Sequence, residues 1–253
     1  MPSGRDRSSR QAARERIAAR RAAEQEKADA ARRRRTRLVS AVAVAAVVVL
    51  AVVVAVVVQS ARTDTGGGPA PANTAGGTGF ALGPADAPVT VDVYEDYLCP
   101  ACRAFEADAS DELAGLVERG DARVVVHPVA ILDRLSADDY STRAANAAAV
   151  VADAAGAEAF RQFSDLLFAE QPAEGGPGLS DDELVDLAAR VGAAGDAVEA
   201  GIRELRYGDW VARVTDEASQ AGLRGTPWVL VDGEPLEVPT AEALTAAVEA
   251  AAP

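Results

Sequence analysis

The chain has 253 residues, of which 49% are apolar and 25% charged, enough for one well-packed domain with additional segments. Its charge is unevenly distributed. Residues 1–37 carry 13 of the 25 basic residues against 5 acidic ones, whereas the remainder carries 12 basic and 34 acidic residues, a net charge of −22. A domain this acidic argues against nucleic acid or an anionic lipid surface as its partner. Such asymmetry indicates two compartments or two tasks.

Residues 38–58, LVSAVAVAAVVVLAVVVAVVV, form an apolar run in which only Ser40 is polar. As a helix the run would span about 31 Å, enough to cross the hydrocarbon core of a bilayer. It is longer than the apolar region of a cleavable signal peptide, and the QSART that follows is a poor cleavage site. We therefore expect an uncleaved transmembrane signal anchor. The preceding basic block, RRRRTR, predicts a cytoplasmic N-terminus and an extracytoplasmic acidic part.

The segments on either side of this anchor lack a hydrophobic pattern. Residues 1–37 are Ala-rich with interspersed Glu and contain no aromatic side chain to stack on a base, so we interpret them as a solvated cytoplasmic tail and not as a nucleic-acid-binding arm. Residues 59–79 are rich in Gly, Pro, Ala and Thr, which is typical of a flexible linker. A single folded domain is therefore expected over residues 80–253.

The first elements of this domain predict a βαβ unit. Val89, Val91 and Val93 alternate with polar or amphipathic residues, as in a strand with one buried face. A helix is expected over residues 100–118, with a proline at its first position and a glycine just beyond its end. The run RVVVHPV, residues 123–129, then reads as a buried strand, which predicts a parallel pair.

The rest of the domain is mostly helical. Residues 137–222 predict helices almost throughout, one of them opening with a capping box formed by Ser180 and Glu183. Two short strands, 228–231 and 236–238, are expected around an Asp-Gly turn, before a final helix. The order of elements predicts an α/β domain with a helical block inserted between two β-containing halves.

The two cysteines of the chain, Cys99 and Cys102, have a C-x-x-C spacing. A structural zinc site needs about four nitrogen or sulfur ligands, but the chain has one histidine and one methionine besides this pair, so we expect no metal. A permanent disulfide would close only a short loop, which restrains the unfolded chain least. The remaining interpretation is a redox-active pair that alternates between a dithiol and a disulfide.

The position of Cys99 favours this redox interpretation. The residue lies at a strand-to-helix junction, where unpaired N–H groups and the positive end of the helix dipole stabilise a thiolate. Cys102, one helical turn later, faces the same side and can resolve a mixed disulfide. A C-x-x-C within a βαβ unit, on the oxidising side of a membrane, is a specific signal for thiol–disulfide exchange.

Two motifs carry a family resemblance. DAPVTVDVYEDYLCPACRAFE resembles the active-site segment of DsbA-type thiol:disulfide oxidoreductases of the thioredoxin superfamily, and SQAGLRGTPWVLVDG resembles the segment with their cis-proline loop. The helical block lies where that family inserts its helices. The resemblance extends from about Gly79 to the C-terminus and implies a thioredoxin-like fold with an inserted helical subdomain. The 24 arginines against one lysine indicate GC-rich coding, which is typical of some bacteria. With the expected anchor, the chain resembles a membrane-anchored bacterial member of this family.

The resemblance also implies roles for particular residues. Cys99 would be the exposed nucleophile, Cys102 the resolving cysteine, and the Pro100-Ala101 dipeptide between them would tune the redox potential. The Thr226–Pro227 bond would be cis and would present the Thr226 backbone to a substrate chain, which pairs there like an added strand. No cofactor is expected.

Two departures from the family pattern concern the direction of electron flow. The family commonly carries an acid six residues before the first cysteine, where this chain has Val93. Glu95 or Asp96 could substitute for it as a proton acceptor, or both could be solvated charges at a strand end. Strongly oxidising members have a histidine at the position of Ala101, so a milder oxidant is expected. The only histidine, His127, lies at a strand end, and thiolate exchange does not require it.

Taken together, the sequence predicts a membrane-tethered extracytoplasmic oxidase that introduces disulfides into thiol-containing exported proteins and is reoxidised by a quinone-linked membrane partner. Two alternatives stay open. A reductase or isomerase of the same fold would use reduced Cys99 to attack wrong disulfides. A non-catalytic thioredoxin-like module would instead bind a partner of the cell envelope.

Overall fold

A computed structural model of the protein describes residues 69–252. The basic tail, the expected transmembrane segment 38–58 and most of the expected linker lie outside the described residues. Within the described range, no helix combines the length and apolarity needed to cross a membrane.

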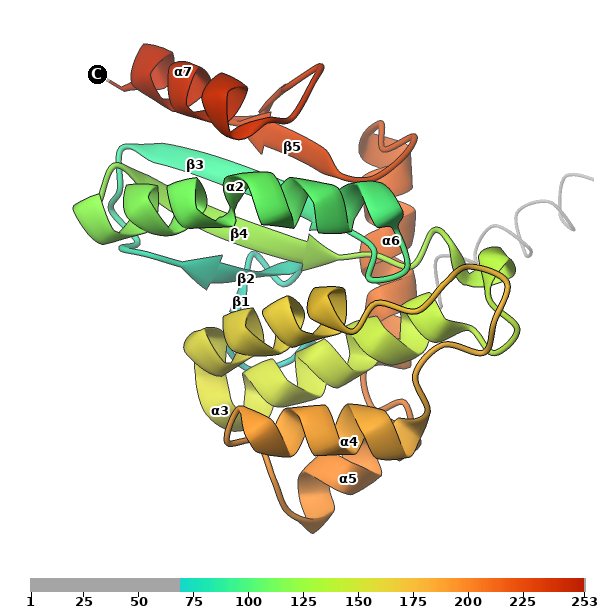
Figure 1. Cartoon of the computed structure of the whole chain (residues 1–253). Coiled ribbons are helices and arrows are strands. Elements are labelled where there is room, and N and C mark those ends of the chain that lie inside the picture. Colours follow the sequence, from blue (N-terminus) through green and yellow to red (C-terminus); the bar gives the residue numbers. More distant parts are fainter. Residues whose placement is uncertain (1–68, 253) are drawn as a thin grey trace, which may run out of the picture. The chain divides into compact units, whose positions relative to one another are not determined.

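The centre of the domain is a six-stranded mixed sheet with the order β1-β2-β4-β3-β5-β6 (Figure 1). Its strands are β1 (Thr74–Ala75), β2 (Gly79–Leu82), β3 (Val89–Glu95), β4 (Ala122–Pro128), β5 (Trp228–Val231) and β6 (Glu234–Pro235). Strands β3 and β4 are parallel, with Val93 opposite Val126, and every other pairing is antiparallel. The predicted βαβ unit is confirmed.

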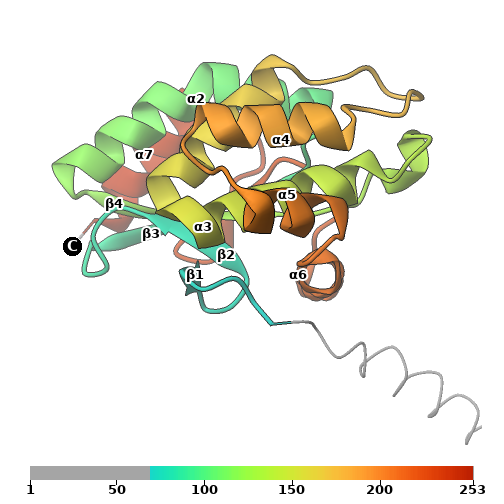
Figure 2. The ribbon, with the colours of Figure 1, turned by 90° about the horizontal axis from the view of Figure 1, so that it is seen from below.

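Helices cover both faces of the sheet and form an additional block beside it. They are α2 (Pro100–Arg119), a 3₁₀ turn η1 (Asp133–Leu135), α3 (Tyr140–Ala169), α4 (Asp181–Arg190), α5 (Asp196–Arg203), α6 (Gly208–Ala221) and α7 (Ala241–Ala251). Helices α2 and α7 lie on one face of the sheet and α6 on the other, while α3, α4 and α5 form a block on the β1–β2 side of the sheet, where α3 contacts β2 (Figures 1 and 2). This α/β arrangement with an inserted helical block agrees with the predicted fold class.

The alternation of β3 explains how the sheet packs. Val89, Val91 and Val93 are completely buried on the face that meets α2, and Glu95 continues the same face at the end of the strand. Removing these branched side chains from water stabilises the fold in proportion to the apolar area that they bury. A second buried cluster surrounds the Ala-rich first half of α3, where small side chains allow the helices of the block to pack closely.

Local signals set several helix ends. The Ser180 hydroxyl accepts a hydrogen bond from the Glu183 backbone N–H, and the Glu183 carboxylate accepts one from the Ser180 backbone N–H, so the predicted capping box is present. Gly120 ends α2 with a left-handed φ of 73°, as glycine does at many helix C-termini. Gly156, with a φ of 86°, interrupts α3 where two separate helices are expected from the sequence.

Three boundaries differ from the sequence prediction. Ordered structure begins before residue 80, because the Gly77 carbonyl accepts hydrogen bonds from the Trp210 indole at 2.7 Å and the Arg213 guanidinium at 3.0 Å, which secures the β1–β2 hairpin. The long helical segment after residue 196 is divided into α5 and α6. The second strand of the last hairpin is at residues 234–235 and not at 236–238, since the tight Asp-Gly turn places these two residues opposite β5.

Candidate active site

The loop between β3 and α2 places Cys99 at the start of the helix. Cys99 is the N-cap residue of α2 in an extended conformation, Pro100 is the first helical residue, and the Cys99 N–H donates to the Asp96 carbonyl at 2.9 Å. Proline fits this position because the N–H that it lacks would have no partner within the helix. The cysteine therefore lies at the helix N-terminus, as predicted.

The buried Asp96 carboxylate holds this loop in place. It accepts hydrogen bonds from the Leu98 N–H at 2.9 Å, the Leu132 N–H at 3.0 Å and the Ser141 hydroxyl at 2.6 Å. The Gln171 side chain adds two hydrogen bonds to the carbonyls of Tyr97 and Cys99. Three regions of the chain thus fix the position of the first cysteine.

The cis-proline loop lies beside the first cysteine. The Thr226–Pro227 peptide bond is cis, as the family resemblance implies. The Cys99 sulfur is 3.2 Å from the Thr226 carbonyl oxygen, to which it donates a hydrogen bond when it is protonated, although 127 residues separate the two in sequence. The structure therefore brings together both motifs on which the resemblance depends.

The two cysteines are free thiols with opposite electrostatic environments. The pKa of Cys99 is lowered to about 5, mainly because the Cys102 thiol donates a hydrogen bond to its sulfur, with further contributions from the backbone N–H groups of Cys102 and Ala101. Cys99 is only 6% exposed, so it is not the exposed residue that the resemblance implies, and its burial opposes this effect. The pKa of the fully buried Cys102 is raised, first by burial and then by its hydrogen bond to Cys99. At neutral pH, Cys99 is a thiolate and Cys102 a thiol.

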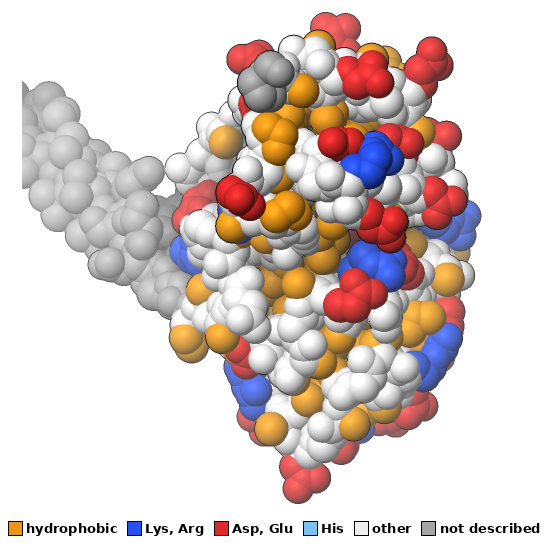
Figure 3. Space-filling view, turned by 90° about the vertical axis from the view of Figure 1, so that its left-hand side faces the viewer, with side chains coloured by type: hydrophobic (Ala, Val, Ile, Leu, Met, Phe, Trp, Pro, Cys, Tyr) orange, Lys and Arg blue, Asp and Glu red, His pale blue; other side chains and the backbone are white. Residues whose placement is uncertain are grey.

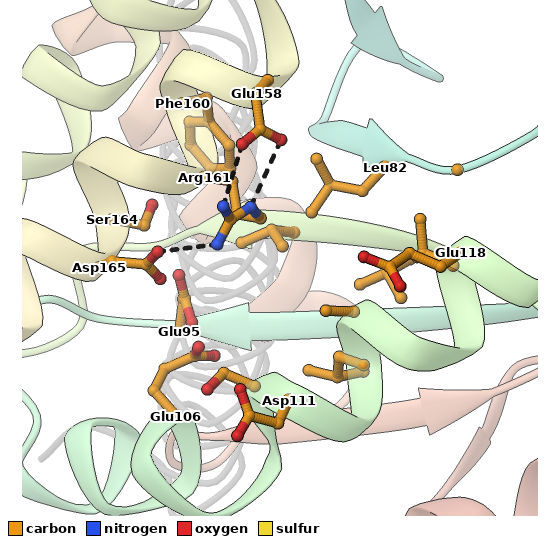
Figure 4. Close-up of a pocket in the computed structure, with 17 residues that line it drawn as sticks. Leu82, Glu95, Glu106, Asp111, Glu118, Glu158, Phe160, Arg161, Ser164 and Asp165 are labelled. Atoms are coloured by element: carbon orange, nitrogen blue, oxygen red, sulfur yellow. Dashed lines mark hydrogen bonds and ion pairs between the residues drawn. The ribbon is translucent and has the colours of Figure 1, made fainter. Parts of the chain in front are cut away.

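A pair of carboxyl groups lies between the end of β3 and the first half of α2. Glu95 at the end of β3 and Glu106 on α2 face each other, across from Arg161 and Asp165 of α3, in a pocket of about 470 Å³ (Figure 4). Burial, followed by the neighbouring Glu106, raises the pKa of Glu95 well above its usual value, and burial together with Asp165 raises the pKa of Glu106 to about 7.

The burial of the acids near the cysteines rules out one of the two interpretations made from the sequence, that of solvated charges. Glu95 and Asp96 are 2% and 0% exposed, so neither is a solvated charge at a strand end. Glu95 lies two residues after Val93 and so faces α2 on the same side of β3. Glu106 was not predicted from the sequence, although its position four residues after Cys102 places both side chains on one face of α2.

His127 has a structural environment. Its ring nitrogens lie 2.9 Å from an Asp92 carboxylate oxygen and 3.1 Å from the Thr78 carbonyl oxygen, and its ring stacks on Tyr94 with centroids 4.3 Å apart. Because both nitrogens are engaged away from the cysteines, the histidine supports packing between β4, β3 and the β1–β2 hairpin and not the chemistry at Cys99.

An open cleft of about 820 Å³ adjoins Cys99. Its lining comes from the first turn of α2, the segment after β4, the end of α6 and the cis-proline loop, and includes Ile131, Leu132, Leu223, Gly225 and Thr226. A substrate chain lying there can reach both the Cys99 sulfur and the Thr226 backbone. The sequence did not show this cleft, because its walls come from loops that meet only in the folded chain.

The described residues contain no group of three or more His, Cys, Asp or Glu side chains arranged to hold a metal ion. The reactive groups that the site does present are its two sulfur atoms. A stabilised thiolate beside a protonated thiol, with an open cleft at the thiolate, is the arrangement that thiol–disulfide exchange requires.

Comparison with known proteins agrees with this geometry. A thioredoxin family model matches residues 75–250. The chain belongs to the thioredoxin family. The reduced DsbA of Mycobacterium tuberculosis is 32% identical with a TM-score of 0.60, and the match covers 68% of this chain and 91% of that one. The DsbG disulfide bond oxidoreductase of the same species is 33% identical with a TM-score of 0.61, covering 75% and 91%. Within the thioredoxin family, the chain is thus of the DsbA type of thiol:disulfide oxidoreductase.

The chain also matches parts of much longer proteins. The Na⁺/H⁺ antiporter NhaA 3 of Salinispora tropica is 33% identical over 170 residues, which is 67% of this chain but 24% of the antiporter. The chain spans about a quarter of the length of the curated relatives that it matches.

Proposed function

We propose that the protein is a membrane-tethered, extracytoplasmic oxidase that introduces disulfides into exported proteins. The observation that carries this proposal is the asymmetry of the cysteine pair. Because the pKa of Cys99 is lowered to about 5, its thiolate is stable, so the reduced form is favoured and the disulfide readily accepts electrons. This value lies between those typical of thioredoxin, about 7, and of a strongly oxidising DsbA, about 3.5. Together with Ala101 in place of a histidine, it supports the proposal of an oxidant milder than a strongly oxidising DsbA.

In the proposed reaction, a thiolate of the substrate attacks the Cys99 sulfur of the Cys99–Cys102 disulfide. The Cys99–Cys102 bond breaks, a mixed disulfide forms, and the Cys102 sulfur leaves with the electron pair and takes up a proton. A second substrate thiolate then attacks the substrate sulfur of the mixed disulfide and releases Cys99 as a thiolate. The substrate loses two electrons, and the enzyme gains them.

Other residues have supporting roles in this proposal. The Thr226 backbone, exposed by the cis bond to Pro227, pairs with the extended substrate beside Cys99. Pro100 and Ala101 tune the potential by fixing the helix start without adding a donor side chain. A quinone-linked membrane partner reoxidises the pair, and residues 38–58 hold the domain at the membrane.

The direction of electron flow is tested by trapping the thiols of intact cells with an alkylating reagent. An oxidase is expected to be found mostly as the Cys99–Cys102 disulfide. A protein found mostly as the dithiol would instead be a reductase or isomerase. If a Cys99→Ser variant restored full function in the host, a non-catalytic binding module would be the correct interpretation.

A further inference from the structure

Two arginines line the cleft next to Cys99. Arg134 lies in the η1 turn on one wall, and Arg224 lies between α6 and the cis-proline loop on another. Both side chains are exposed. Basic side chains are scarce in this domain, where residues 69–252 contain 11 arginines, no lysine and 33 acidic residues.

Most other arginines of the domain are neutralised by carboxylates. On the face shown in Figure 3, basic side chains lie beside acidic ones. Six of the 11 arginines form ion pairs, namely Arg119, Arg143, Arg161, Arg190, Arg203 and Arg213. Among the described residues, no carboxylate pairs with Arg134 or Arg224. The Arg224 guanidinium donates only to the carbonyls of Ser219 and Leu223, which holds it in place and leaves its second terminal nitrogen free.

Neither arginine is among the main causes of the lowered pKa of Cys99. The pKa of Cys99 is lowered mainly by hydrogen bonds from the Cys102 thiol and from two backbone N–H groups. The cleft contains one carboxylate, Glu174, against the two guanidinium groups. In the oxidised protein, where residue 99 carries no charge, the cleft is therefore locally positive within a strongly negative domain.

We propose that this cleft selects cysteine-containing segments that carry Asp or Glu within a few residues of the reacting cysteine. The inference rests on the proposed function and names its substrate class. A carboxylate on the substrate pairs with the planar donors of Arg134 or Arg224 while the substrate sulfur meets Cys99. After the reaction, the new thiolate at Cys99 cancels the positive charge of the cleft, which weakens the hold on the product.

The test compares two dithiol peptides of identical composition and net charge with the oxidised full-length protein in detergent. One peptide has two Glu flanking the first cysteine, and the other has them about ten residues away. At 0.15 M salt the Debye length is about 8 Å, so charges farther apart than this are largely screened. The repulsion that remains from the acidic domain acts on both peptides alike, because they have the same net charge. We expect kcat/KM to be about threefold to tenfold higher for the peptide with the flanking Glu, since each exposed ion pair contributes a few-fold at most.

The ratio of the two rates is the readout, because it cancels any general loss of activity in a variant. The ratio should fall to about one in 1 M salt, where the Debye length is about 3 Å. It should also fall to one or below in an Arg134→Glu, Arg224→Glu double variant. Arg206→Glu is the matched control, because Arg206 is exposed, lacks a carboxylate partner among the described residues and lies outside the cleft; its ratio should equal that of the wild type.

Equal rates for the two peptides in the wild type, or a preference that persists in 1 M salt or in the double variant, would overturn the inference while leaving the proposed function intact. The function itself is checked separately with a small uncharged dithiol. If the oxidised wild type reacts neither with this dithiol nor with either peptide, the oxidase proposal fails, and the inference fails with it.

Discussion

At the scale of single residues, the two sulfur atoms have the same chemistry and different surroundings. The Cys99 sulfur is next to backbone N–H groups at a helix start and to the open cleft, whereas Cys102 is completely buried one turn further along the helix. A thiol in an apolar interior keeps its proton, and that proton is then available to stabilise the neighbouring thiolate. The reactivity of one cysteine is therefore largely a property of the other.

We predict that Cys102→Ala raises the pKa of Cys99 from about 5 toward the ordinary thiol value, by at least about one unit, because the largest stabilising hydrogen bond is removed. The rate of alkylation of Cys99 by iodoacetamide against pH measures this, since only the thiolate reacts. Cys102→Ser is the matched control: it keeps a hydroxyl donor and should shift the inflection less. An unchanged inflection in Cys102→Ala would mean that the helix end alone stabilises the thiolate.

The carboxyl pair leads to a prediction about stability and pH. Folding raises the pKa values of Glu95 and Glu106, so the folded state binds protons more tightly than the unfolded state. The stability is then largest below the ordinary carboxyl value and falls as the pH rises from about 4.5 toward the value of about 7 for Glu106. A glutamine at position 95 resembles the protonated acid and removes the unfavourable ionisation.

Accordingly, Glu95→Gln should increase the free energy of unfolding at pH 8, by on the order of 1–3 kcal/mol, and should change it little at pH 4.5. Urea unfolding at both pH values measures the difference. Glu118→Gln, an exposed position on α2, the helix that carries Glu106, serves as the control and should leave both values unchanged. If the stability of Glu95→Gln falls between the two pH values as steeply as that of the wild type, the pair does not titrate as proposed.

At the scale of elements, one carboxylate joins three parts of the fold. Asp96 connects the β3–α2 loop, the segment after β4 and the first turn of α3. Burial raises its pKa to about 6, although its three hydrogen bonds lower it, so the carboxylate is largely ionised at neutral pH. Hydrogen bonds to an ionised group are stronger than those between neutral groups, which suits a position that must hold Cys99 against the cis-proline loop.

Asp96→Ala should destabilise the protein by about 3–5 kcal/mol, because it leaves the buried N–H groups of Leu98 and Leu132 without an acceptor. Ser141→Ala removes only the third hydrogen bond and should cost about 1 kcal/mol. Chemical denaturation of both variants gives the two values. A loss for Asp96→Ala no larger than that for Ser141→Ala would show that the loop finds other acceptors.

Some of the elements could be predicted from the sequence and others could not. Strand β3, helix α2 and the capped helix α4 were predictable because their signals are local: alternation, a first-turn proline and a capping box. The β1–β2 hairpin was missed because its Gly-rich sequence is ordered by Trp210 and Arg213, more than 130 residues away. The cysteine pair and the cis-proline loop were found through motifs, whereas the Glu95–Glu106 pair depends on how β3 packs against α2 and leaves no local pattern.

At the scale of the whole molecule, the proposed function requires the domain to face an oxidising compartment. The charges of the sequence support this arrangement, because a block of basic residues precedes the apolar run and a strongly acidic domain follows it. An apolar run with an extended cytoplasmic basic block orients itself by these charges, since moving them across the membrane is unfavourable. The orientation is then a property of the tail, while the chemistry is a property of the domain.

The chain offers a direct way to measure its own topology, because Cys99 is the more accessible and reactive of its two cysteines. After mild reduction of intact cells, a membrane-impermeant maleimide should label the wild type as fully as a permeant one does. Replacing the arginines of the RRRRTR block by asparagine should reduce impermeant labelling, because some chains then insert with the domain in the cytoplasm. Labelling with the permeant reagent is the control for folding and amount. If only the permeant reagent labels the wild type, the domain faces the cytoplasm, and oxidation of exported proteins is no longer a tenable function.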